Sequence, residues 1–134
     1  MKILQEIIFS YAKVQLLDAK LVRIEVFGEL VIDGKRTKEL NDAIGILSKG
    51  KEILVLMMAE ELTQVNEEAM AFSASEEGQR YTIADAMVVK SITQRVMANL
   101  YLSLNKPQKP SKIFNSEKDA VKWLLSLEKV RVKV

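Results

Sequence analysis

The sequence predicts an α/β domain built on a mixed, mostly parallel sheet of about five strands with four helices. Three observations support this fold class. Two segments near the N-terminus alternate polar and apolar residues, two later segments are mainly apolar, and amphipathic segments of helical period separate the later strands. We expect two strands, then four helices alternating with three further strands, all within a single domain of residues 1–134.

An antiparallel hairpin is expected first. Residues 11–18, YAKVQLLD, and residues 21–28, LVRIEVFG, alternate in polarity and meet at the turn-like triplet DAK. A helix follows within residues 37–50, where Lys49 and Gly50 are typical of a helix C-terminus. Its apolar stripe consists of Leu40, Ala43, Ile44 and Leu47.

Two buried strands are expected. Residues 52–59, EILVLMMA, form a continuous apolar run of the kind found in parallel sheets, and residues 84–90, ADAMVVK, are the next buried strand. Residues 63–78 lie between them and predict a second helix. Asn66 is its expected N-cap, and the glutamates that follow suit the positive end of the helix dipole.

A third helix is expected after its cap, Ser91, with its apolar stripe facing the sheet. A short strand at residues 111–114 and a helix within residues 115–129, capped by Ser116, complete the fold. The tail, residues 130–134, suits either an edge strand or a frayed end. The inward stripe of the third helix comprises Ile92, Val96, Met97, Leu100, Tyr101 and Leu104.

The chain contains neither cysteine nor histidine. This excludes disulfides, thiol nucleophiles, histidine-based triads and nearly all zinc sites. No apolar run approaches the roughly 20 residues that span a bilayer, and the N-terminal segment lacks the features of a signal peptide. We therefore expect a cytoplasmic protein with no membrane span, no cofactor and no enzymatic activity.

Charge is unevenly distributed along the chain. Residues 52–77 contain seven acidic and no basic residues, whereas residues 78–134 contain eleven basic and four acidic ones. Complementary segments of this kind suit a homodimer, or a basic partner for the acidic segment. Two solvated helix surfaces would explain the same pattern.

Residues 84–124 combine an apolar strand, a helix, a loop with lysine and proline, a short strand ending in phenylalanine, and a last helix. With the preceding hairpin and helix, this arrangement resembles the SpoIIAA-like family of small bacterial proteins with STAS/SEC14-type domains. The resemblance extends from Tyr11 to Leu127. The residues that carry it are Lys106, Pro107, Pro110, Phe114, Ala120, Trp123 and Leu124.

The better-known relatives in that family are anti-sigma-factor antagonists, which bind a partner protein and are switched by phosphorylation. The resemblance therefore implies a non-catalytic regulatory or scaffolding domain that acts through protein contacts. The Asp-Ser-Ser-Gly-like turn that carries the phosphoserine is missing from residues 59–70, AEELTQVNEEAM. Thr63 is the nearest hydroxyl, at a helix N-terminus that favours phosphate but among glutamates that oppose it. The candidate partner surface comprises Thr63, Glu67, Glu68, Arg95 and Asn99.

Other ligand classes find less support. Lys90 and Ser91 suit a weak anion site, or simply a solvated lysine and a helix cap, and no glycine-rich phosphate loop accompanies them. Adjacent glutamates on a helix point about 100° apart, so the acidic pairs do not converge on a metal or substrate. Residues 106–112 lack the arginines and aromatics of a nucleic-acid interface, so no nucleic-acid partner is expected.

Five large apolar residues suit either a hydrophobic core or the lining of a pocket. The SEC14 side of the resemblance favours a pocket. The domain would then be a carrier that binds a lipid or small apolar ligand between its sheet and its helices. The five residues are Met57, Met58, Tyr101, Phe114 and Trp123.

Overall fold

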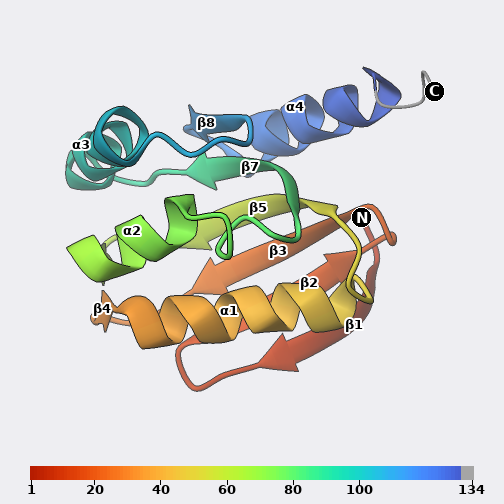
Figure 1. The fold of residues 1–134 in the computed structure, drawn as a ribbon, viewed down its shortest axis with the longest axis horizontal. Helices are drawn as coiled ribbons and strands as arrows, with labels where there is room; N and C mark the ends of the chain where they lie inside the picture. The colour runs from red at the N-terminus through yellow and green to blue at the C-terminus, as the bar shows by residue number, and fades with distance from the viewer. Residues whose placement is uncertain (131–134) are drawn as a thin grey trace.

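The computed structural model describes the backbone of residues 1–130 and the side chains of residues 1–127. Its main feature in this range is a mixed sheet in the order β1-β2-β3-β5-β7-β8 (Figure 1). The first three strands pair antiparallel, and those from β3 to β8 pair in parallel. The mixed, mostly parallel sheet is therefore confirmed, with six strands instead of about five. Their bounds are Ile3–Ile8, Ala12–Leu17, Leu21–Val26, Ile53–Ala59, Thr82–Val88 and Ser111–Phe114.

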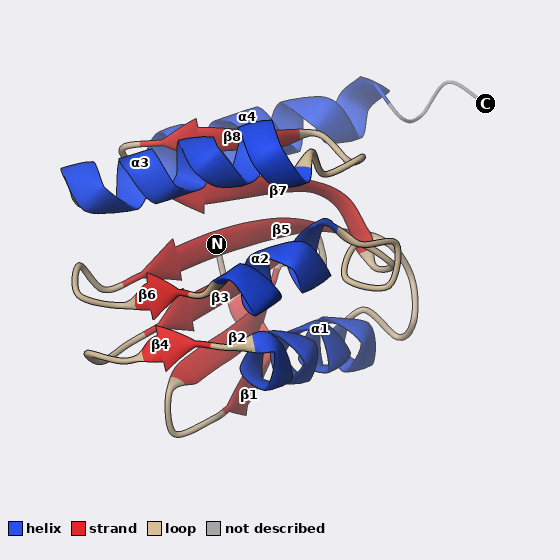
Figure 2. Cartoon of the chain, turned by 60° about the vertical axis from the view of Figure 1, so that its left-hand side comes forward, coloured by secondary structure: helices blue, strands red, loops and turns tan. Residues whose placement is uncertain are grey.

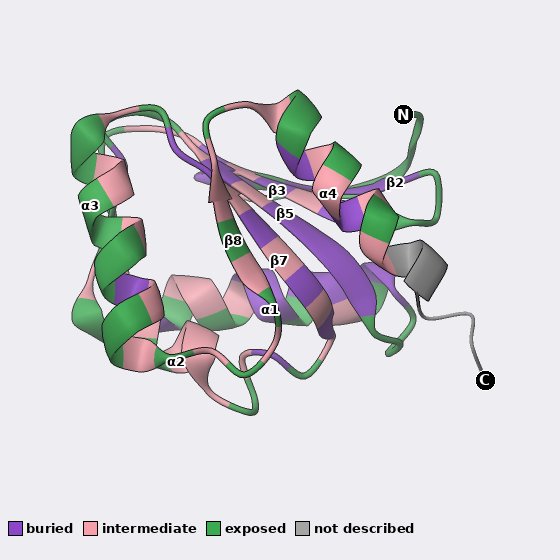
Figure 3. Cartoon of the chain, turned by 90° about the horizontal axis from the view of Figure 1, so that it is seen from above, coloured by how far each residue is buried: buried purple, intermediate pink, exposed green. Residues whose placement is uncertain are grey.

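The described residues contain four α-helices: α1 Gly34–Leu47, α2 Glu67–Ala74, α3 Ile92–Leu100 and α4 Glu117–Val130. The crossovers from β3 to β5, β7 and β8 all advance in one direction across the sheet. Right-handed connections therefore place α1, α2 and α3 on the same face. α4 follows the last strand and lies on the opposite face from α1 (Figure 3). Each of these helices is too short or too polar to cross a lipid bilayer.

A second, two-stranded sheet leads into α1 and α2. Its strands, β4 (Val31–Ile32) and β6 (Gln64–Val65), pair in parallel (Figure 2). For the tail, residues 130–134, the sequence suits either an edge strand or a frayed end. Val130 is the last residue of α4, and the rest of the tail lies outside the described residues.

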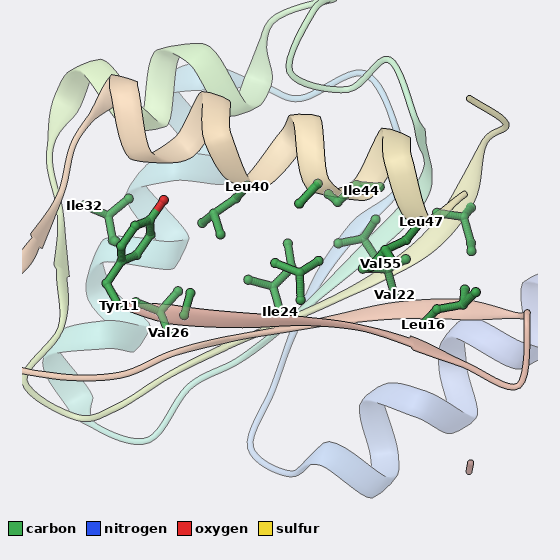
Figure 4. Close-up of a cluster of buried hydrophobic side chains, with 14 of the residues drawn as sticks. Tyr11, Leu16, Val22, Ile24, Val26, Ile32, Leu40, Ile44, Leu47 and Val55 are labelled. Atoms are coloured by element: carbon green, nitrogen blue, oxygen red, sulfur yellow. The ribbon is translucent and has the colours of Figure 1, made fainter. Parts of the chain in front are cut away.

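The sheet separates two hydrophobic clusters. The larger cluster lies between α1 and the sheet, where the predicted stripe of α1 packs on β2, β3 and β5 (Figure 4). The smaller cluster lies between α4 and β5, β7 and β8. Alternate side chains of β5 enter one cluster or the other, so this strand is buried on both faces as its apolar run predicts.

The predicted hairpin is formed by β2 and β3, which pair antiparallel. Asp18 and Ala19 have positive φ angles of 49° and 55°, and the Lys20 N–H donates to the Leu17 carbonyl at 2.9 Å. This is the geometry of a two-residue turn that matches the twist of the flanking strands. The DAK triplet is therefore the turn of the hairpin.

β1 is a sixth strand that the sequence pattern does not predict. It pairs with β2 alone and forms one edge of the sheet. Ile3, Leu4 and Ile8 remain between 45% and 62% exposed, so no inward face imposes alternation on the segment ILQEII. A strand held mainly by backbone bonds to one neighbour leaves a weak pattern in the sequence.

α1 begins earlier than predicted, at Gly34. The Asp33 carboxylate accepts a hydrogen bond from the Arg36 N–H at 2.9 Å and caps the helix. At the other end, the predicted stop is confirmed: Gly50 has a φ of +76° and its N–H donates to the Gly45 carbonyl at 2.8 Å.

α2 starts where predicted and ends earlier. The Asn66 side chain accepts a hydrogen bond from the Ala69 N–H at 2.9 Å, which confirms the predicted cap. The helix stops at Ala74, because Ser75 is extended and its hydroxyl donates back to the Phe72 carbonyl. The glutamates at positions 76 and 77 therefore follow α2 instead of extending its acidic surface.

The apolar stripe of α3 does not face the sheet, and that prediction is wrong. Ile92 is 83% exposed and Leu104 is 74% exposed, and Tyr101 is the one stripe residue that is buried. The contacts of α3 are with β8 and with the π-helical turn η1 (Tyr101–Asn105) that continues it. In Figure 3 the helix is coloured almost throughout as exposed or intermediate, in contrast to β5.

Candidate functional site

A cavity of about 600 Å³ lies between the sheet and the helices of the α1 face. Side chains of β5 and β7 form its floor, and side chains of α1, α2, α3 and η1 form its walls. It reaches the carboxyl ends of the parallel strands, where ligands bind in many open α/β sheets. Its apolar lining includes Leu40, Ile44, Val55, Met57, Met70, Met87 and Met97.

α3 is held at its two ends and by one side-chain hydrogen bond between them, which Arg95 donates to the Asn115 side chain after β8. Ser91 caps the helix, as predicted, and accepts a hydrogen bond from the Gln94 N–H at 3.1 Å. The Gln94 side chain donates to the Glu60 carbonyl at 2.7 Å, which ties the start of α3 to the end of β5. Tyr101 is buried at the other end, and no residue from Ile92 to Leu100 is buried. The space beneath the helix belongs to the cavity.

Exposed apolar side chains surround the mouth of this cavity. Leu62, Val65 and Met97 line it and are 62%, 39% and 38% exposed. Ile92, Val96, Leu100 and Leu104 continue this apolar surface along α3 and η1. Contiguous exposed apolar surface of this kind marks a site of interaction in many proteins.

Three lining residues have buried polar atoms without a hydrogen-bond partner in the protein. They are Asn41 Oδ1, Gln79 Nε2 and Asp85 Oδ1, and they are all such atoms found among the described side chains. The amide orientations follow from other bonds, because Asn41 Nδ2 donates to the Glu77 carbonyl and Gln79 Oε1 accepts from the Lys109 N–H, both at 3.0 Å. The cavity wall thus carries two unpaired acceptors and one unpaired donor, each of which costs stability.

Asp85 is the central residue of β7. Its neighbours Ala84 and Ala86 pack toward α4, while Asp85 itself lines the cavity. Burial raises the pKa of Asp85 from 3.8 to about 6, and the nearby Ser111 hydroxyl opposes this shift. Burial, and then the negative charge of Asp85, raise the pKa of the Tyr101 hydroxyl well above its usual value. Tyr101 therefore remains a protonated hydrogen-bond donor beside an ionisable carboxyl group.

Thr63 is the member of the candidate partner surface that lines the cavity. It is 5% exposed, and its hydroxyl donates to the Gly28 carbonyl at 2.7 Å. This bond joins the segment after β5 to the segment after β3. In the structure the hydroxyl holds two loops together and does not face the solvent.

The other candidate partner residues lie on two helices. Glu67 is exposed in the first turn of α2. Glu68 is also exposed, but its side chain lies against Gly34, where an added Cβ would come within 2.1 Å of the carboxylate. Arg95 is half-buried and Asn99 is exposed, both on α3. The five residues thus come from the loop after β5, from α2 and from α3.

The five residues with a predicted core or pocket role divide between the faces of the sheet. Met57 and Tyr101 line the cavity. Met58, Phe114 and Trp123 belong to the cluster under α4, where the rings of Phe114 and Trp123 lie 5.6 Å apart. Two of the five positions therefore line the cavity, and the other three belong to the core under α4.

Sequence reasoning missed the polar residues of the cavity. Asp85 does leave a signal, because it is a charged residue inside an otherwise apolar strand. Asn41 leaves a weaker one, since it lies one turn before Ile44 on the buried stripe of α1. Gln79 lies in a loop and leaves none. Its role depends on a contact with Lys109, which lies 30 residues away in the chain.

Comparisons with known proteins identify a family. None of the curated proteins compared with the chain matches it. Among solved structures, the chain is similar to a protein with unknown function from Arthrobacter sp. fb24, at 20% identity and a TM-score of 0.31, covering 84% of this chain and 97% of that one. Residues 15–128 match DUF7793, a domain of unknown function. The chain therefore belongs to the DUF7793 family.

Proposed function

We propose that the protein is a non-catalytic carrier that binds an apolar ligand between its sheet and the helices α1, α2 and α3. The observation that supports this most is the apolar cavity of about 600 Å³ bordered by the exposed apolar stripe of α3. This volume lies within the range of small-molecule sites, which combine apolar walls with a few polar groups. The cavity of this protein has both.

The cost of this arrangement also favours a ligand. Protein interiors are close-packed, and a helix normally buries its apolar stripe. Here α3 leaves its stripe uncovered next to a cavity that contains unpaired polar atoms. A bound molecule would cover apolar surface and pair polar atoms in one step.

Binding of a neutral, environment-sensitive dye such as Nile red tests the proposal. Wild-type protein is expected to bind the dye with a blue shift and increased emission. Ala98→Trp should abolish the signal by filling the cavity, because Ala98 lines it. Asn99→Trp is the matched control, since the next residue is exposed and outside the lining.

Failure of the wild-type protein to bind the dye would contradict the proposal, as would equal binding by both tryptophan variants. Native mass spectrometry of protein purified from its own host provides the second test. A co-purified lipid or other apolar molecule, absent from Ala98→Trp, is the expected result.

A regulatory or scaffolding domain that acts through protein contacts is the second candidate function. The exposed stripe of α3 and the acidic start of α2 favour it. Glu67→Lys and Val96→Asp should both weaken capture of a specific partner without lowering the melting temperature. Partner lists identical to that of the wild type would reject this alternative.

The finer family assignment is part of the same proposal. We propose that the domain is of SpoIIAA-like, STAS/SEC14 type, supported by the hairpin, the three one-directional crossovers and the Phe114–Trp123 contact in the C-terminal motif. A cytoplasmic location, expected from the absence of cysteine, and a homodimer, expected from the complementary charges, stay predictions of this assignment.

A further inference from the structure

We propose that the ligand is an amphiphile with an aliphatic chain and a cationic amine head, and that Asp85 and Asn41 bind the head. This inference rests on the proposed carrier function and specifies its ligand class. It follows from the charge of the cavity, from the positions of its unpaired atoms, and from the separation of its polar and apolar ends.

The charge of the cavity favours a cation. Its lining includes two carboxylic acids, Asp85 and Glu61, and the hydroxyl of Tyr101. No lysine or arginine is found among the described residues that line it. The carboxylate of a fatty acid bound near Asp85 would meet a buried negative charge with no positive partner, which is unfavourable in a site of low dielectric. A cationic head would reverse the sign of this interaction.

The unpaired atoms match an ammonium group. A primary ammonium has three donors and no acceptor, and Asn41 Oδ1 and Asp85 Oδ1 are buried acceptors without a partner. Hydrogen bonds between an ammonium and a carboxylate are among the stronger ones in proteins. Gln79 Nε2 is an unpaired donor, and it suits a hydroxyl or carbonyl oxygen next to the amine.

The polar atoms share one end of the cavity. The Gln79 side chain accepts from the Lys109 N–H, and the main-chain N–H of Asp85 donates to the Pro110 carbonyl, so both residues adjoin the segment before β8. Asn41 bonds to the Glu77 carbonyl, two residues from Gln79. The exposed apolar residues of the mouth lie toward the other end, where β5 leads into Leu62 and Val65. An amphiphile would thus place its head near Asp85 and its chain along α3.

Competition with the bound neutral dye tests the inference. Dodecylamine, dodecanol and dodecanoate have the same chain and differ in head charge, and each is used below the concentration at which it forms micelles. We expect dodecylamine to displace the dye from the wild type at the lowest concentration and dodecanoate at the highest. Asp85→Asn should weaken dodecylamine by about tenfold or more and leave dodecanol nearly unchanged.

Two further variants complete the design. Asp42→Asn is the matched control, because Asp42 is an exposed carboxylate on α1 outside the cavity lining. It should leave the preference for the amine unaltered. Glu61→Gln changes an exposed residue at the mouth without risk to folding, and it should reduce the preference for dodecylamine over dodecanol by a smaller factor than Asp85→Asn.

The outcomes separate this inference from the carrier function. Dodecanol that binds as well as dodecylamine, in both wild type and Asp85→Asn, would overturn the amine inference and leave the carrier function standing. Preferred binding of dodecanoate would do the same. A wild-type protein that binds neither dye nor any of the three compounds would overturn both.

Discussion

α3 and α4 share a sequence pattern, but the structure places them in different environments. Each has a serine cap and an apolar stripe at helical spacing, and each follows a strand of the parallel part of the sheet. α4 buries Ala120 and Leu124 completely against β5 and β7, whereas α3 buries no residue between Ile92 and Leu100. Amphipathic period thus predicts that a helix has an apolar face, but not what covers that face.

The difference arises from the positions that the chain leaves for each helix. The third right-handed crossover places α3 on the face of the sheet that α1 and α2 already cover. α3 is instead bonded to the end of β5 and contacts β8. α4 packs on the opposite face of the sheet and covers the part formed by β5, β7 and β8. The proposed binding surface therefore lies at α3, the helix whose residues from Ile92 to Leu100 the core leaves unburied.

The largest expected effect comes from removing one stripe residue from each helix. Leu124→Ala should lower the free energy of unfolding by about 2–5 kcal/mol, because the side chain is fully buried and leaves a cavity. Leu100→Ala on α3 should cost less than about 1 kcal/mol, since the residue is 43% exposed. Urea denaturation measures both. Equal losses would mean that α3 packs as α4 does.

Asp85→Asn tests the cavity beneath α3, and it should stabilise the folded protein at neutral pH. The pKa of Asp85 is about 6 in the folded protein, against an ordinary value of 3.8. The native state therefore binds more protons than the unfolded state between these values, and stability falls as pH rises through them. The ionised group costs on the order of 3 kcal/mol above that window.

Melting curves of Asp85→Asn and wild type across that pH range are the measurement. The variant should melt higher at about pH 7.5, and the difference should shrink toward about pH 4, because there Asp85 is protonated in the folded state and the two states bind nearly the same number of protons. Glu61 and Tyr101 are the other titratable groups of the cavity lining, and they are unchanged in the comparison. A difference independent of pH would show that Asp85 is not a buried ionisable group.

A smaller effect is expected on the part of the sheet face that α4 does not cover. There, the side chains of Glu6, Gln15, Arg23 and Glu117 form a hydrogen-bonded row across β1, β2, β3 and α4, with an Arg23–Glu117 ion pair at 2.7 Å. Glu117→Gln should cost about 0.5–1 kcal/mol, because the pair is partly exposed and screened by solvent. The loss should decrease at high salt. A loss above that of Leu124→Ala would contradict this assignment.

The smallest effect is expected on the outer surface of α3. Ile92→Ser should change the free energy of unfolding by less than about 0.5 kcal/mol, since the side chain is 83% exposed. The same change should leave binding of the neutral dye nearly unchanged, because Ile92 does not line the cavity. Strong destabilisation in urea would place Ile92 in the core.

The sequence predicts most of the fold because local patterns carry it. The unbroken apolar run of β5, the turn at Asp18 and Ala19, and the caps Asn66 and Ser91 all act through near neighbours. β1 escapes prediction because an edge strand buries little and has no imposed period. The orientation of α3 cannot be predicted from its own sequence, because it depends on the face of the sheet that α1 and α2 occupy.

The candidate site is less predictable for the same reason. Asp85, Asn41 and Gln79 come together from β7, α1 and a loop, and no local pattern links them. The predicted pocket residues Met57 and Tyr101 do line the cavity, but Phe114 and Trp123 have equally apolar neighbours and belong to the other core. The face of the sheet to which each of these residues belongs is set by how the strands pair, which depends on contacts between distant segments.

The absence of cysteine allows the environment of α3 to be measured directly. Met97→Cys places a single thiol at the mouth of the cavity, and its rate of maleimide labelling in native protein reports whether α3 stands away from the sheet. The account predicts rapid labelling, like that of Asn99→Cys, which slows for Met97→Cys alone when an apolar ligand is added. Labelling of Met97→Cys as slow as that of Leu124→Cys, with or without ligand, would contradict it.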